Sequence, residues 1–156
     1  MKFYSAEEYQ LNCHERFAYY KKEIQKLLPT ARVEHVGASS VPNAISKGDL
    51  DIFIGVDARH FESAVRTLLT LGFREKQDTL RTHELCMLES LTEDVAFQVV
   101  TNNSEFEFFL VFRDKLRKNP ALVEQYNNLK KSCEGCSQED YRAKKSKFVE
   151  YVLAQP

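Results

Sequence analysis

The hydrophobic pattern of the first half of the chain predicts two long helices and two strands. In two segments, apolar residues recur every three or four positions, which is the spacing of a helix that buries one face. Two shorter runs are rich in β-branched and aromatic residues, and the second is almost continuously apolar, as in a strand covered on both faces. The predicted elements are a helix over residues 6–28, a strand over 32–36, a turn over 37–40, a short helix over 42–46, a strand over 50–56 and a helix over 59–71.

The second half is predicted to begin with strands and to end with helices. A strand is expected over residues 73–77, followed by a hairpin with arms at 82–89 and 94–101. Helical spacing then continues, with helices predicted over 104–118, 120–131 and 138–153. This order places a small mixed β-sheet with flanking helices in the middle of the chain and makes the C-terminal third helical. The predicted fold class is therefore α+β.

The ends of the two N-terminal helices carry sequence signals. Ser5 and Glu8 have the spacing of a capping box, in which each side chain can bond the other residue's backbone. Asp57 is expected to cap the helix that follows it, and Gly72 to supply the left-handed residue after its last turn.

At 156 residues and 18.1 kDa, the chain has the size of one globular domain. We expect a single domain over residues 1–156, with a sheet core over about 30–101 and a helical part over about 104–154. Apolar residues make up 43% of the sequence and charged residues 29%, which excludes disordered and collagen-like proteins. Because no apolar run reaches the length of about 18 residues that a membrane helix needs, and no signal peptide is evident, we expect a cytoplasmic protein without a membrane partner.

Charge is balanced over the whole chain but uneven along it. The net charge of −1 provides no global field that would attract nucleic acid or an anionic membrane. Between Arg113 and Lys147, however, ten basic residues face only five acidic ones. This segment forms either solvated helix faces or a basic wall opposite an acidic one. No base-reading motif is present, so the sequence gives no strong nucleic-acid signal.

The four cysteines are expected to be reduced thiols. Cys13 and Cys86 are isolated, and the Cys133–Cys136 pair lacks the second pair of ligands that a zinc site requires. A redox role for that pair is the alternative, although no strand precedes it as in thioredoxin-like sites.

The most informative chemistry lies in the segment that leads into the second strand. Gly37 opens a turn of small residues, Ala38, Ser39 and Ser40, which would let a phosphate approach the backbone amides. Asp49 and Asp51 are two residues apart on a predicted strand, so both carboxylates project from one face. Two such charges repel each other unless a divalent cation lies between them, and oxygen ligands suit Mg²⁺ or Mn²⁺. Alternatively, Asp49 is exposed where the strand begins and Asp51 pairs with a nearby basic residue such as Lys47.

Five sequence blocks resemble the GrpB family, whose fold belongs to the nucleotidyltransferase superfamily. The similarity covers most of the chain and keeps the family's order. The similar blocks are His35–Pro42, Lys47–Ile52, Phe112–Pro120, Tyr126–Lys130 and Tyr141–Phe148.

The resemblance implies that a nucleoside monophosphate is transferred from a nucleoside triphosphate to an unknown acceptor with Mg²⁺ or Mn²⁺. In that interpretation Asp49 and Asp51 are the catalytic metal ligands, and Asp94 is the third carboxylate, with Glu84 in reserve. The residues expected to hold the nucleotide phosphates are Gly37, Ala38, Ser39, Ser40, Lys47, Arg113, Lys130 and Lys145. Alternatively, Arg113 forms a structural ion pair, and Lys130 and Lys145 face the solvent.

The sequence also departs from the family pattern. The family's Gly-Ser is Gly37-Ala38 here, and its late His-x-His aligns with Ala96-Phe97-Gln98. Loss of both imidazoles favours a second hypothesis, a nucleotide- or phosphate-binding module without turnover. The additional Asp49 favours the enzyme instead. A third hypothesis is an interaction domain whose acids are merely solvated, and His35 is expected to be a hydrogen-bonded core residue.

Overall fold

The protein is built around a five-stranded mixed sheet. The structure, a computed structural model, describes residues 2–156. The strands lie in the order β1-β2-β5-β4-β3; β2 and β5 are parallel, and every other neighbouring pair is antiparallel. They are β1 (Arg32–Val36), β2 (Leu50–Val56), β3 (Phe73–Glu75), β4 (Leu85–Ser90) and β5 (Val95–Thr101). The predicted α+β class is confirmed.

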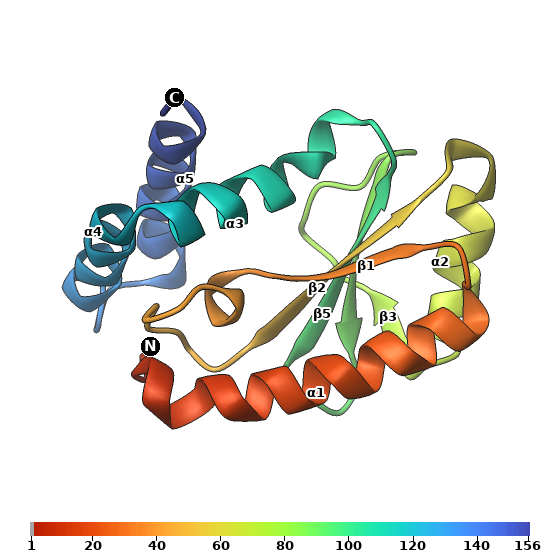
Figure 1. The fold of residues 1–156 in the computed structure, drawn as a ribbon, viewed down its shortest axis with the longest axis horizontal. Helices are drawn as coiled ribbons and strands as arrows, with labels where there is room; N and C mark the ends of the chain where they lie inside the picture. The colour runs from red at the N-terminus through yellow and green to blue at the C-terminus, as the bar shows by residue number, and fades with distance from the viewer. Residues whose placement is uncertain (1) are drawn as a thin grey trace.

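Helices cover both faces of this sheet and extend beyond one end of it (Figure 1). The helices α1 and α2 pack on one face, whereas α3 crosses the other and continues into the pair α4 and α5. Their bounds are α1 (Ala6–Leu27), α2 (Phe61–Leu69), α3 (Phe108–Lys118), α4 (Pro120–Ser132) and α5 (Gln138–Leu153). Three single 3₁₀ turns complete the fold: η1 (Ala38–Ser40), η2 (Ala58–His60) and η3 (Glu105–Glu107).

The face under α1 and α2 carries the largest hydrophobic core. Ile52 and Ile54 of β2 and Phe97 and Val99 of β5 point into it and are buried. Because side chains alternate along a strand, the residues between them face the opposite side. The near-continuous apolar sequence of β2 thus reflects a central strand with both faces covered.

The opposite face is apolar at one end and polar at the other. Phe53 and Val100 pack against Phe106 and Leu110 at the start of α3. A separate cluster joins α3, α4 and α5 to the chain after η1; its buried members are Val41, Ala44, Leu116, Leu122, Val123, Tyr126, Phe148 and Val152. The polar end of the sheet therefore faces helices that are held by a core of their own.

Most predicted elements form within a few residues of their expected bounds, but the short helix over 42–46 does not. Asn43 has a φ of 68°, which interrupts any right-handed helix, and the segment is a turn. At the start of α1, the Glu8 carboxylate accepts hydrogen bonds from the Ser5 amide at 3.3 Å and the Ser5 hydroxyl at 2.9 Å. The Asp57 carboxylate accepts from Asn102 instead of capping a helix amide.

The cysteines and the length of the helices are two further features of the fold. All four cysteines are free thiols, and Cys13, Cys86 and Cys133 are buried. Among residues 2–156, no helix combines the length and the apolarity that crossing a bilayer requires.

Candidate functional site

A cavity of about 340 Å³ lies between the polar end of the sheet and the helices α3 and α5. Its floor is formed by η1 and the β2 and β5 strands, and its walls by the two helices. The predicted site residues that line it are Gly37, Ala38, Lys47, Asp49, Asp51, Arg113 and Lys145. Residues that are 108 positions apart in the sequence thus meet at one site.

The acid pair sits on this floor, where β2 begins. Asp51 is half-buried and pairs in the sheet with Val36 of β1 and Ala96 of β5. Asp49 is also half-buried and accepts a hydrogen bond from the Ser46 hydroxyl at 3.2 Å. Burial raises the pKa of Asp51 to about 6, and the negative charge of Asp49 adds to that rise. The pair therefore holds unfavourable negative charge that a cation would relieve.

Gly37 lies directly against Asp51. Its φ of 74° and ψ of −178° belong to a region that essentially only glycine occupies. A Cβ atom on Gly37 would overlap Asp51 Oδ2 and lie 3.1 Å from Asp51 Cβ. The glycine is therefore required both by the backbone and by the close approach of the turn to the carboxylate.

The serines of this turn do not line the cavity, contrary to expectation. The Ser39 hydroxyl lies 2.7 Å from Nε2 of His35, and the Ser40 hydroxyl donates to the Gly37 carbonyl at 2.6 Å. Both side chains are buried beneath the turn because these partners lie there. Among the described residues, no hydrogen bond uses the amide of Ala38 as a donor, and Ala38 lines the cavity, so this amide remains available to an anion.

His35 is a core residue, as expected. Its ring stacks on Phe17 with centroids 5.1 Å apart, and burial lowers its pKa to about 4. It is therefore neutral near pH 7, and it does not line the cavity.

Three lysines surround the acids, and one of them is not where the sequence predicts. Lys47 and Lys145 are exposed and line the main cavity. Lys130 is only 2% exposed; its Nζ donates to the Ile45 carbonyl at 2.6 Å and lies 3.7 Å from the centroid of the Tyr126 ring. Burial lowers the pKa of Lys130 to about 7, and the charge of Lys145 adds to that shift. Lys130 lines a small pocket of about 40 Å³ that Asp49 and Asp51 also line.

Arg113 forms a structural ion pair, which was the alternative to phosphate binding. Its guanidinium contacts Glu34 at 2.7 Å and Asp114 at 3.0 Å, and donates to the His35 carbonyl at 3.1 Å. It is 7% exposed and so ties α3 to β1 at the edge of the cavity. These acceptors engage its Nε and Nη1, whereas its Nη2 donates to no described residue, so the ion pair does not use the whole guanidinium fork.

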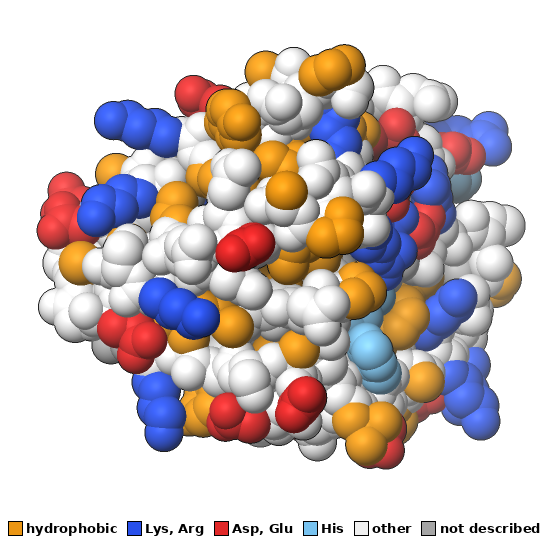
Figure 2. Space-filling model, turned by 60° about the vertical axis from the view of Figure 1, so that its left-hand side comes forward, with side chains coloured by type: hydrophobic (Ala, Val, Ile, Leu, Met, Phe, Trp, Pro, Cys, Tyr) orange, Lys and Arg blue, Asp and Glu red, His pale blue; other side chains and the backbone are white. Residues whose placement is uncertain are grey.

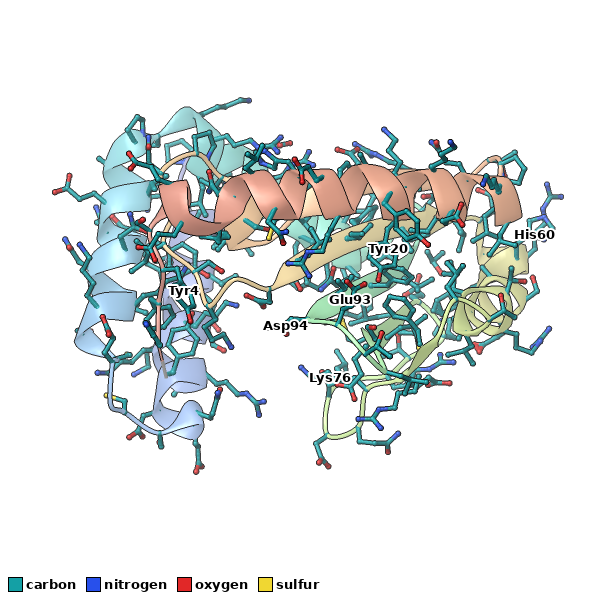
Figure 3. The ribbon with its side chains drawn as sticks, turned by 90° about the horizontal axis from the view of Figure 1, so that it is seen from below. Tyr4, Tyr20, His60, Lys76, Glu93 and Asp94 are labelled. Carbon is teal, nitrogen blue, oxygen red and sulfur yellow. The ribbon has the colours of Figure 1, made fainter. Side chains whose placement is uncertain are left out.

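No third carboxylate joins the acid pair within the described part of the chain. Asp94 is exposed and lies outside both cavities, although its carbonyl accepts the Leu50 amide at 3.0 Å and so aligns β5 with β2. Figure 3 shows it next to Glu93, where the turn from β4 leads into β5. Glu84 also lies outside both cavities. The side chain beside Asp51 on β5 is Gln98, whose Nε2 donates to Asp51 Oδ1 at 3.3 Å.

The donors present are oxygens, which fits Mg²⁺ or Mn²⁺ better than a softer metal. Asp49 and Asp51 would hold such an ion. Over residues 2–156, however, no group of three or more histidine, cysteine, aspartate and glutamate side chains is placed to bind a metal. An ion here would need further oxygen ligands from the ligand, from water or from an uncharged side chain.

Several cavity residues carry no signal in the local sequence. Lys76 follows β3 at the far edge of the sheet, and Arg142 lies on α5; both line the cavity and are exposed. Phe108, Phe109 and Phe112 of α3 form an apolar wall. In the sequence these aromatic residues are indistinguishable from the buried face of an ordinary helix.

The face of the molecule drawn in Figure 2 does not carry one continuous basic surface. Figure 2 shows a cluster of Lys and Arg side chains to the right of centre, and other charges scattered among acidic and hydrophobic side chains. On this face, the basic side chains therefore do not form a continuous wall.

Two curated proteins are similar along almost the whole chain. A UPF0157 protein of Vibrio cholerae is 63% identical over 156 residues, which covers 99% of this chain and 83% of that protein. A UPF0157 protein of Deinococcus radiodurans is 28% identical over 142 residues, which covers 88% of this chain and 74% of that protein.

Solved structures share the fold at lower sequence identity. The crystal structure of conserved protein GrpB from Enterococcus faecalis has a TM-score of 0.78 at 22% identity, with 97% of each chain covered. The Cid1 poly(U) polymerase with MgGTP bound has a TM-score of 0.52 at 14% identity; the match covers 78% of this chain and 41% of Cid1. The protein therefore has a nucleotidyltransferase-like fold. Because the sequence profile of the GrpB protein matches residues 5–155, the chain belongs to the GrpB family.

Proposed function

We propose that this protein binds a nucleoside triphosphate with Mg²⁺ and transfers its nucleoside monophosphate to an acceptor hydroxyl. The observation that carries the proposal is one cavity that contains an acid pair, a glycine turn with an unused amide and exposed lysines. Anionic phosphates, a divalent cation and carboxylates are the groups that such a set of side chains complements. The fold shared with Cid1 supports the same reaction class.

Each part of the site has a task in this reaction. Asp49 and Asp51 would hold the cation, and the amide of Ala38 would donate to a phosphate oxygen. Lys47 and Lys145 would offset the charge of the triphosphate. A bound Mg²⁺ would neutralise the phosphates and help to align them.

The transfer itself exchanges one phosphorus–oxygen bond for another. The acceptor oxygen forms a bond to the α-phosphorus, the bond from that phosphorus to the β-phosphate bridging oxygen breaks, and pyrophosphate leaves. The hydroxyl proton passes to water. The cavity residues contribute by holding the triphosphate in line, because little covalent chemistry is required of the protein in this reaction class.

A second function is favoured by a specific observation. Asp94, the expected third carboxylate, lies outside the cavity, and the side chain that contacts Asp51 from β5 is the uncharged Gln98. A protein with this arrangement can bind a nucleotide and a cation without turnover. The alternative is therefore a nucleotide-binding module of the same fold.

Calorimetric titration with ATP, GTP, CTP and UTP, with and without Mg²⁺, tests the proposal. We expect binding that requires Mg²⁺ and is lost in the Asp49→Asn/Asp51→Asn double variant. Asp94→Asn is the matched control, because it removes one exposed carboxylate outside the cavity. If Asp94→Asn abolishes binding as well, our assignment of the acids is wrong.

The same titration separates the competing functions. Binding without pyrophosphate release, measured over a panel of hydroxyl acceptors, would support the module. Binding that does not need Mg²⁺ would contradict the role given to the acid pair. Failure of all four nucleotides to bind would contradict both functions.

A further inference from the structure

The lining of the cavity differs from one end to the other. At the charged end, the acids share a smaller pocket with Ala38, Lys47 and Lys145. Among the described residues, nothing from β4 or α3 reaches that smaller pocket. At the apolar end, the main cavity is lined by Met87 of β4 and by the apolar wall of α3. A ligand that fills the cavity therefore meets charges at one end and apolar side chains at the other.

The sheet fixes how far the apolar end lies from the acids. Met87 is directly opposite Gln98 of β5, and the Lys76 amide donates to the Met87 carbonyl at 2.8 Å. Opposite residues share a face of the sheet, so Gln98, Met87 and Lys76 form one row across the floor of the cavity. Because neighbouring strands are about 4.8 Å apart, Met87 lies two strands, or about 10 Å, from the strand that carries Asp51. That distance leaves room for a sugar and a base beyond a phosphate held at the acids.

The side chains at the apolar end leave part of their surface open to the cavity. Met87, Phe108 and Phe109 are only half-buried, although all three pack against the buried cluster of β2, β5 and α3 behind them. The rings of Phe108 and Phe109 stack on each other with centroids 4.3 Å apart, which fixes their relative position. Open aromatic surface in a cavity is typical of a site for a flat, apolar group.

Few polar groups at this end are fixed in position. The Gln98 amide already donates to Asp51 at 3.3 Å, and its Oε1 is enclosed by protein. Lys76 lies at the exposed margin. A base bound here would be held by its faces, because stacking on aromatic side chains is favourable for every base and needs no hydrogen bond at the edge of the base.

The charges determine the direction in which a nucleotide would lie. With its β- and γ-phosphates against Lys47 and Lys145, a triphosphate has its α-phosphate at the acids. Its sugar and base then extend away from the lysines, toward Met87. The apolar end is thus where the nucleoside lies when the phosphates occupy the charged end.

We propose that Met87 and the apolar wall form a subsite that holds the nucleobase by its faces, and that the protein therefore accepts all four common nucleoside triphosphates. The inference rests on the proposed function, which places the phosphates at the charged end. It adds where the nucleoside lies, and it specifies the substrate class as nucleoside triphosphates without selection for one base.

Calorimetry that compares ATP with ribose 5-triphosphate, both with Mg²⁺, tests this inference. The two probes have the same sugar and phosphates and differ in the base. The wild type should bind ATP at least about tenfold more tightly, because only ATP stacks on the aromatic wall. The affinities for ATP, GTP, CTP and UTP should lie within about tenfold of one another.

Variants of α3 show whether the wall is responsible. Phe109→Ala should weaken the binding of ATP about tenfold and leave that of ribose 5-triphosphate unchanged. Phe109→Tyr keeps an aromatic ring and should bind ATP like the wild type. Val111→Ala is the matched control on the same helix, because Val111 is 44% exposed and lies outside the cavity; it should bind both probes like the wild type.

A spectroscopic measurement on the wild type locates the base directly. The chain contains two methionines, so labelling with ¹³C-methyl methionine gives a simple spectrum, in which Met87→Leu identifies the Met87 signal. The ring current of a stacked base should shift that signal when ATP binds. Ribose 5-triphosphate has no ring of this kind and should leave the signal in place.

The outcomes separate this inference from the proposed function. Equal affinities of the wild type for ATP and ribose 5-triphosphate would overturn the base subsite while the proposed function stands. So would unchanged ATP affinity in folded Phe109→Ala, weak ATP binding in Phe109→Tyr, or a Met87 signal that ATP moves no further than ribose 5-triphosphate does. A preference of more than about tenfold for one base would overturn the lack of selection. If none of the nucleotides and not ribose 5-triphosphate either binds, the proposed function itself is wrong.

Discussion

The two faces of the central sheet differ sharply, although the same two strands supply both. Under α1 and α2, alternate residues of β2 and β5 are Ile52, Ile54, Phe97 and Val99, and all are buried in one continuous core. On the face toward α3 and α5, the residues next to them include Asp51 and Gln98, which border a cavity. We call the face under α1 and α2 the closed face and the face toward α3 and α5 the open face. The largest hydrophobic core lies on the closed face, and the groups capable of chemistry lie on the open face.

This division follows from the alternation of side chains along a strand. A polar residue between two apolar ones is directed to the other face, so a well-packed core and a half-buried carboxylate can occupy adjacent positions. The closed face provides a rigid base. The open face can then tolerate unfavourable groups such as two neighbouring carboxylates, whose repulsion the core offsets.

The largest expected effect is on the closed face. Phe97→Ala should lower the free energy of unfolding by about 3–5 kcal/mol, because Phe97 is fully buried and stacks on Phe73 with centroids 3.9 Å apart. Urea denaturation followed by circular dichroism measures it. Phe109→Ala removes the same ring from the half-buried cavity wall and should have less than half of that effect. Equal losses of unfolding free energy in the two variants would mean that the two faces of the sheet contribute equally to stability.

The second-largest expected effect is the loss of the ion pair between Arg113 of α3 and Glu34 of β1. Arg113→Ala should lower the free energy of unfolding by about 2–3 kcal/mol, since it leaves Glu34 and the buried His35 carbonyl without the guanidinium. Glu34 keeps its contact with Arg32, which moderates the loss. Arg74→Ala breaks an exposed pair with Glu89 and should change stability by less than about 0.5 kcal/mol. Similar values for the two variants would contradict the role given to Arg113.

Gly37→Ala should damage both the fold and the site. The strained backbone and the overlap with Asp51 predict a loss of about 2 kcal/mol in stability and a loss of nucleotide binding. Thermal unfolding and calorimetry measure the two effects. Gly135→Ala is the control, since it has a φ of 86° but nothing within 4 Å of the added Cβ. A fully active Gly37→Ala protein would show that the turn does not approach the acids in solution.

The smallest expected effect is a gain in stability, from replacing Asp51 by asparagine. Because the folded-state pKa of Asp51 is raised to about 6, this carboxyl group binds more protons in the folded protein than in the unfolded chain between about pH 4 and pH 6. The contribution of Asp51 to stability should therefore fall as the pH rises from about 4 to about 6. In the absence of divalent cations, Asp51→Asn should raise the free energy of unfolding by about 1–2 kcal/mol at pH 8 and change it little at pH 4.

Thermal scans at both pH values measure this gain. Comparing the variant with the wild type at each pH removes the contribution of His35, whose lowered pKa acts on both proteins alike. A lower melting temperature for Asp51→Asn at pH 8 would reveal a structural ion pair in place of repulsion.

Much of the fold could be predicted because it follows from local periodicity. The last helix, α5, begins and ends at the predicted residues, and the β4–β5 hairpin and both long N-terminal helices form near their expected bounds. The exception is the segment around Asn43, where a single left-handed residue overrides a plausible helical sequence. Local propensity alone does not reveal that conformation.

The site was predictable only in part. The nearness of Gly37 to Asp51 follows from a turn and a strand that are close in the sequence. The inward direction of the Ser39 hydroxyl and the burial of Lys130 depend on partners, His35 and Ile45, that the sequence does not place. Lys76 carries no local signal at all.

The sequence by itself determined the order of helices and strands, the face on which Asp49 and Asp51 lie, and the family, because these depend on residue spacing along one chain. Tertiary structure alone decided which cations line the cavity, that Asp94 lies outside it, and that Gln98 contacts Asp51. The physical reason is that those relations join distant segments. They are set by how α3 and α5 pack over the sheet, and by which polar groups find partners once that packing is complete.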